Sequence, residues 1–108
     1  EREDLSEAAK QLEWITQTDV DSAIKDLAYL RLSRVKLEQE QFTDALNQLN
    51  LVASESYDSQ IEEVKGDIFQ RQGKIDEAME AYTAALEEAA NNQVLQMKLD
   101  DLTSQKQG

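Results

Sequence analysis

The chain has 108 residues, a formal net charge of -12, and no proline, cysteine or histidine. The missing histidine and cysteine exclude Ser-His and Cys-His catalysis and the common zinc sites, and the excess of carboxylates argues against binding to nucleic acid. No run of 18 apolar residues occurs, so nothing in these residues spans a bilayer. With 40% hydrophobic residues and no proline, the composition predicts an all-α protein with short connections and no cofactor.

The first predicted helix covers residues 4–17 and is interpreted as the second helix of a truncated repeat. Its apolar residues Leu5, Ala9 and Leu12 share one side, and no earlier helix of this chain covers that side. Trp14 has two interpretations, a core or groove residue covered by the next helix or an interface residue. We expect either a homodimer through this end, with Leu5, Leu12 and Trp14 at the interface, or an upstream segment that covers it.

Residues 21–54 form the first complete predicted repeat, with one helix over 22–39 and a second helix from Phe42. Asp21 or Ser22 is expected to cap the first of these helices. That helix is apolar on two sides, which predicts that it lies between two neighbours. One stripe holds Ile24, Leu27, Ala28, Leu32 and Val35, and the other holds Leu30 and Leu37.

Residues 57–90 form the second predicted repeat. Ser59 and Glu62 have the spacing of a capping box at the start of its first helix, and Gly73 stands where that helix must stop. A last helix over 92–104 places its leucines on one stripe and is interpreted as a cap on the open end of the stack.

Internal repetition is the strongest signal in the chain. Three segments beginning at Leu5, Phe42 and Ile75 align without gaps, so they lie 37 and 33 residues apart. Each carries an acid and then an alanine at the same positions, and this period is typical of a helix-turn-helix repeat. The sequence therefore predicts stacked antiparallel helix hairpins.

Small residues mark the expected closest approach of the two helices in each hairpin. In the second repeat Gly66 is expected to meet Ala78, with Ala85 next along the helix. The matching positions in the first repeat are Ser33, Ala45 and Val52.

The second repeat, "VKGDIFQRQGKIDEAMEAYTAAL" from Val64, resembles the tetratricopeptide repeat family. The family's small residue, aromatic residues and alanines stand at Gly66, Phe69, Ala78, Tyr82 and Ala85. The chain departs from the family pattern at three positions, since Glu62, Lys65 and Ala90 replace the usual Trp, Leu and Pro.

A closer resemblance covers most of the chain and is to the ancillary subunits of the bacterial Sec translocon, the YfgM type. It rests on "LRLSRVKLEQEQFTDALNQL" from Leu30, "VKGDIFQRQGKIDEA" from Val64 and "LQMKLDDL" from Leu95. The resemblance implies a periplasmic domain of a single-pass inner-membrane protein whose anchor is absent from this chain. It also implies Sec translocon subunits and a membrane-anchored periplasmic isomerase-like chaperone as partners, in work on exported proteins. The alternative is a free soluble scaffold that assembles other protein complexes.

Stacked hairpins present a concave surface made mainly by the first helix of each repeat, and such surfaces bind segments of other proteins. Neighbouring carboxylates such as Glu62 with Glu63 are interpreted as a solvated face rather than an acid and base pair, because adjacent helical residues point in different directions. The sequence thus predicts a non-catalytic binding module without a metal site. The candidate concave residues are Leu30, Arg34, Leu37, Glu63, Asp67, Gln70 and Arg71.

Overall fold

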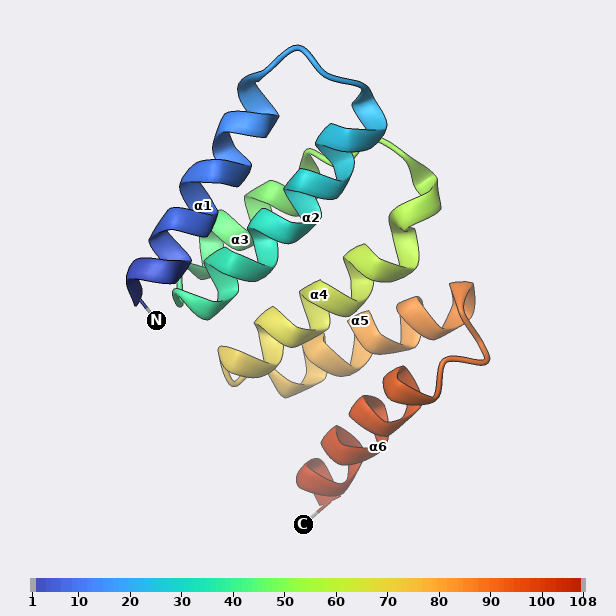
Figure 1. The fold of residues 1–108 in the computed structure, drawn as a ribbon. Helices are drawn as coiled ribbons and strands as arrows, with labels where there is room; N and C mark the ends of the chain where they lie inside the picture. The colour runs from blue at the N-terminus through green and yellow to red at the C-terminus, as the bar shows by residue number, and fades with distance from the viewer. Residues whose placement is uncertain (1, 108) are drawn as a thin grey trace. The chain divides into compact units, whose positions relative to one another are not determined.

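The computed structural model describes residues 2–107, and helices are the only regular secondary structure in that range (Figure 1). Each predicted helix is present, with bounds within three residues of those expected, so the all-α repeat class is confirmed. The chain divides into two compact units, residues 1–55 and 56–108, and the single domain over 1–108 stays a prediction. The helices are α1 Arg2–Gln17, α2 Ser22–Glu38, α3 Phe42–Asn50, a 3-10 turn η1 Glu55–Tyr57, α4 Asp58–Arg71, α5 Ile75–Glu88 and α6 Gln93–Gln107.

In the first unit, α2 packs against both α1 and α3 (Figure 1), as expected for a helix that is apolar on two sides. Ala28, Leu32 and Leu37 are buried. The stripe prediction was nevertheless wrong for Ile24 and Leu27, which are 49% and 40% exposed. These two residues lie on the face of α2 that carries charged rather than apolar neighbours, and no helix of this unit covers it.

A buried carboxylate ties the end of the first hairpin to its first helix. Asp26 on α2 is 3% exposed and accepts hydrogen bonds from the backbone N–H groups of Ala53 and Ser54, at 2.9 and 3.2 Å. The segment after α3 is thereby fixed against α2, because both carboxylate oxygens are used.

Ser59 lies 33 residues after Asp26, at the matching repeat position of the second unit. Like Asp26, it makes a side-chain hydrogen bond to the backbone near the end of the second helix of its hairpin. Its hydroxyl donates to the carbonyl oxygen of Ala85 on α5 at 3.0 Å. The capping box predicted at Ser59 was wrong. The turn η1 leads directly into α4, which begins at Asp58, so Ser59 lies inside the helix and not at its N-cap. Its hydroxyl bonds to α5 instead. Asp21 does occupy the N-cap position of α2, but its side chain makes no capping hydrogen bond.

In the second unit, α5 lies against both α4 and α6 (Figure 1). Tyr82 of α5 is fully buried with Leu95 and Leu102 of α6, and Leu99 packs on the edge of this cluster. The three leucines of the predicted cap therefore do cover α5. The alanines Ala78 and Ala85 complete the cluster and are both 0% exposed.

The predicted close approach between paired helices is confirmed in the first unit, where the Ser33 hydroxyl on α2 donates to the Ala45 carbonyl oxygen on α3 at 2.8 Å. In the second unit Gly66 lies close to the paired helix α5, and its predicted contact with Ala78 stays a prediction. The atoms that a Cβ at Gly66 would meet first belong to the ring of Tyr82, not to Ala78. The absent side chain makes room for an aromatic ring rather than for a methyl group.

The first helix of each repeat, α2 in the first unit and α4 in the second, ends in the same way. At Gly73, with φ of 78°, the N–H groups of Gly73 and Lys74 donate back to Gln70 and Phe69 at 3.0 and 2.8 Å. This pair of bonds is a Schellman motif, which needs a residue in the left-handed region. The predicted stop at Gly73 is confirmed.

The end of α2 repeats the motif with a less suitable residue. Glu40 holds a φ of 61°, and the N–H groups of Glu40 and Gln41 donate to Leu37 and Lys36, both at 2.9 Å. A residue with a Cβ is strained in this conformation by about 1 kcal/mol relative to glycine.

Replacing Glu40 by glycine is therefore expected to raise the free energy of unfolding by about 0.5 to 1 kcal/mol. Urea unfolding followed by helical circular dichroism measures the effect. Gly73→Ala is the matched control, since a Cβ there would have nothing within 4 Å and any loss comes from the backbone alone. A Glu40→Gly variant that is less stable than the parent would contradict the strain at this position.

Within residues 2–107, none of the helices combines the length and the apolar character that crossing a membrane requires.

Candidate protein-binding surface

Three of the four predicted concave residues of α4, namely Glu63, Asp67 and Gln70, form part of a polar cluster with Tyr82 of α5 and Lys98 of α6. The Lys98 ammonium lies 2.8 Å from Oε2 of Glu63 and 3.1 Å from Oδ1 of Asp67. The Tyr82 hydroxyl donates to Asp67 and also to Oε1 of Gln70, the latter at 3.3 Å. The ammonium also lies 5.8 Å from the centre of the Tyr82 ring, within reach of a cation–π attraction.

Burial shows that this cluster serves the fold. The side chains of Glu63 and Asp67 are only 18% and 16% exposed, so most of their surface is covered within the chain. Carboxylates that are this enclosed need a cation, and Lys98 supplies it from α6. The structure thus brings Glu63, Asp67 and Gln70 together around Lys98 and Tyr82, in a contact that holds α6 on α4.

Replacing Lys98 by methionine is expected to lower the free energy of unfolding by about 1 to 3 kcal/mol, because it removes the ammonium that bonds to both of these enclosed carboxylates. Urea unfolding at low and at high salt measures the loss. Lys106→Met is the matched control, since Lys106 pairs with Asp76 at 2.6 Å between side chains that are 57% and 67% exposed. An exposed pair of this kind contributes about 0 to 1 kcal/mol. Equal losses in the two variants would show that the enclosed cluster has no special role.

The remaining concave residues separate into buried and exposed ones. Leu30 and Leu37 are 8% and 4% exposed, so their placement on an open surface was wrong: they are core residues of the first unit. Arg34, Gln70 and Arg71 are exposed. Hydropathy alone could have separated the buried residues from the exposed ones, since the two buried residues are both leucines and the three exposed ones are polar.

Trp14 is 68% exposed and borders an open hollow on α1 together with Lys10, Gln11 and Ile15. Its interpretation as a residue covered by the following helix was therefore wrong. Leu5 and Leu12 are half-buried, in agreement with an apolar side that is only partly covered, because α1 packs against α2. Of the three residues expected at an interface, Trp14 offers the large exposed apolar surface.

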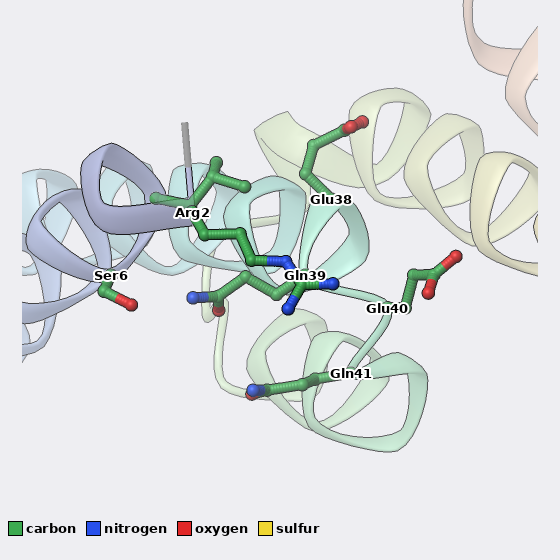
Figure 2. Close-up of a pocket in the computed structure, with 7 residues that line it drawn as sticks. Arg2, Ser6, Glu38, Gln39, Glu40 and Gln41 are labelled. Carbon is green, nitrogen blue, oxygen red and sulfur yellow. The ribbon is translucent and has the colours of Figure 1, made fainter.

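A pocket of about 300 Å³ lies where the start of α1 meets the end of α2, and Leu5 is one of its lining residues. Figure 2 shows the Arg2 side chain extending to Gln39, while the carboxylates of Glu38 and Glu40 point away from it. Ser6 is the only hydroxyl among the lining residues, and the sequence contains no histidine to activate it. Among the described residues, no group of three or more acidic side chains is placed to hold a metal ion.

Comparison with known families agrees with this architecture. The family described as tetratricopeptide repeat-like domain matches residues 1–104 of the chain. The chain belongs to this family. The tetratricopeptide repeat-like domain shows the family's glycine, aromatic residue and alanines at Gly66, Tyr82, Ala78 and Ala85, all of them in the packed core of the second unit.

The resemblance to ancillary translocon subunits is also confirmed. This tetratricopeptide repeat-like domain is 35% identical, over 94% of its length, to a protein of Neisseria gonorrhoeae named ancillary SecYEG translocon subunit. A protein of the same name from Buchnera aphidicola subsp. Schizaphis graminum is 25% identical over 91% of the chain. The chain covers 50% and 52% of these two proteins, so it spans about half the length of the curated relatives it matches.

Proposed function

We propose that this chain is the non-catalytic, protein-binding domain of an ancillary subunit of the Sec translocon. The observation that carries the proposal is the 35% identity over 94% of the chain to a protein with that name. A helical repeat architecture is consistent with it, because stacked helices offer extended surfaces for other proteins. The absence of any His or Cys from the sequence removes the commonest nucleophile and base pairs.

In this proposal the domain acts in the periplasm and belongs to a protein held in the inner membrane by a segment outside these 108 residues. Its partners are Sec translocon subunits and a membrane-anchored periplasmic isomerase-like chaperone, and it assists exported proteins. The exposed residues among those predicted to bind partners are the proposed contact residues, Arg34 in the first unit and Gln70 and Arg71 in the second.

Copurification from native cells tests the proposal. The full-length protein is tagged, the membranes are solubilised gently, and the recovered proteins are identified by mass spectrometry. A matched protein that lacks the residues of this chain is the control. Recovery of translocon subunits and the chaperone with the first protein, and their loss with the second, would support the proposal. Recovery from the soluble fraction without any translocon subunit would replace it with a free scaffold.

We also propose a homodimer that forms through α1, with Trp14 at its centre and the half-buried Leu5 and Leu12 beside it. The net charge of -12 on each chain opposes self-association, so the apolar contact must outweigh repulsion between the copies. Sedimentation equilibrium at high protein concentration and high salt tests this. A monomer under those conditions would exclude the dimer, and a dimer that is lost in Trp14→Gln would support it.

A further inference from the structure

Helix α5 ends less firmly than α2 and α4 do. Those two helices each close with a Schellman motif at a residue of positive φ, whereas Ala89 at the end of α5 has a φ of -145°. The Ala89 N–H donates to the carbonyl oxygen of Leu86 at 3.2 Å. The last turn of α5 contains Glu87 and Glu88 and no basic residue, so its charge is unfavourable at the negative end of the helix dipole.

The sequence from α5 to α6 contains no residue that forbids a helix. No glycine or proline stands between Gly73 and Gly108, and the connection over 89–92, here called the hinge, reads "AANN". Ala90 replaces the proline that is usual in the repeat family, and alanine is the strongest helix former. The bend is supported locally by Asn92, whose Oδ1 accepts a hydrogen bond from the Leu95 N–H at 3.1 Å. Without the bend, residues 75–107 would form one helix about 50 Å long.

Helix α6 packs on its own unit through one side. Leu95, Leu99 and Leu102 follow at spacings of four and three residues and pack in the cluster around Tyr82 of α5. From the same side Lys98 reaches two carboxylates on α4. An identical helix from a second copy would fit this position equally well, because each of these contacts is re-formed when the helices are exchanged.

We propose that α5 and α6 straighten at the hinge and that two copies of the chain exchange their α6 helices, which gives a domain-swapped dimer. The partner is therefore a second copy of this chain. Each α6 then places its leucines on Tyr82 and its Lys98 beside Glu63 and Asp67 of the other copy. The inference goes beyond the proposed function and does not depend on it. It also differs from the dimer proposed through α1, because the two dimers use different helices.

The balance between monomer and swapped dimer lies in the hinge, because the contacts of α6 are the same in both. The dimer gains helical residues at 89–92 and removes the acidic helix end at Glu87 and Glu88. It loses the Asn92 cap in each chain and the independent motion of two chains. High protein concentration favours the dimer by mass action.

Refolding of the chain at low and at high protein concentration tests the proposal. Trp14→Gln serves as the parent protein, so that a dimer through α1 does not interfere. Gel filtration with light scattering measures the dimer fraction. For nuclear magnetic resonance, carbon-13-labelled and unlabelled chains are mixed before refolding, so that contacts between chains are detected separately. The expected result is a dimer in which the Leu102 methyl groups of one chain contact the Tyr82 ring of the other.

Two substitutions at the exposed Ala90 should reduce the dimer and leave the monomer folded, which circular dichroism checks. Ala90→Gly lowers helix propensity at both hinges of the dimer and should weaken association by about tenfold or more. Ala90→Pro prevents a continuous helix, so no dimer is expected. Ala89 already lies outside the α region, which a following proline favours. Ala53→Gly is the matched control, because Ala53 is an exposed alanine after α3 and its replacement should leave the dimer fraction unchanged.

Three results would overturn the inference. The first is a parent protein that stays monomeric after refolding at high concentration. The second is a dimer in which Leu102 contacts Tyr82 only within its own chain, since the copies would then associate without exchange. The third is an equal dimer fraction in the parent and in both Ala90 variants. Copurification with translocon subunits is a separate measurement, so its outcome does not affect these three.

Discussion

Replacing Gly66 by alanine is expected to lower the free energy of unfolding by about 2 to 3 kcal/mol, although alanine favours a helix more than glycine does by about 1 kcal/mol. A Cβ at Gly66 would lie 2.4, 2.6 and 2.8 Å from three ring carbons of Tyr82. The ring cannot easily move aside, because it is fully buried and its hydroxyl donates to Asp67. The clash must therefore be relieved by separating α4 from α5.

The first unit suggests a second substitution that should compensate for Gly66→Ala. It pairs Ser33 with Leu49 at the positions that correspond to Gly66 and Tyr82, so a larger first residue is compatible with a smaller second one. Gly66→Ala combined with Tyr82→Leu should lose less stability than the two changes added together, by about 1 kcal/mol or more.

Urea unfolding of the four proteins of this cycle measures the coupling. Ser33→Ala is a control for the first unit, since it removes a hydroxyl at the same repeat position without adding an atom, and it should cost about 1 kcal/mol. If Gly66→Ala raised the stability, as helix propensity alone predicts, the close approach of α4 to α5 would be refuted.

The helices were predictable because the signals that define them are local or repeated. The starts of α3 and α5 at Phe42 and Ile75 follow from the aligned segments, and the end of α4 follows from Gly73. The repeat also located the tight contact of Ser33 with Ala45. In each case one residue type is needed at one position for a steric or backbone reason that the sequence itself expresses.

The surface was less predictable, because exposure depends on which helix lies opposite. Leu27 and Leu37 are the same residue on the same helix, yet one is 40% and the other 4% exposed. Asp67 has the spacing of an open concave residue, but Lys98, 31 residues away, encloses it. A capping box at Ser59 is a local signal that was overridden by a bond to Ala85 on another helix. No periodicity reports such long-range partners.

Replacing Asp26 by alanine is expected to lower the free energy of unfolding by about 2 to 4 kcal/mol. Its carboxylate accepts two backbone hydrogen bonds, from Ala53 and Ser54, while only 3% of the residue is exposed. Hydrogen bonds to a charged acceptor contribute about 1.5 to 3 kcal/mol each, although part is recovered because the freed N–H groups can bind water. The loss should be concentrated in the segment after α3.

Two variants and a second measurement give this prediction its control. Asp26→Asn keeps one acceptor oxygen and should lose about half as much stability. Ser59→Ala, at the matching position of the second unit, removes a single neutral hydrogen bond to Ala85 and should cost about 1 kcal/mol. In Asp26→Ala the amides of Ala53 and Ser54 should exchange with solvent faster, while those of α5 stay protected. If Asp26→Ala changed neither the amide exchange nor the free energy of unfolding, the prediction would be wrong. The cost of burying the carboxylate would then equal the gain from its two hydrogen bonds, and Asp26 would not hold the segment after α3 in place.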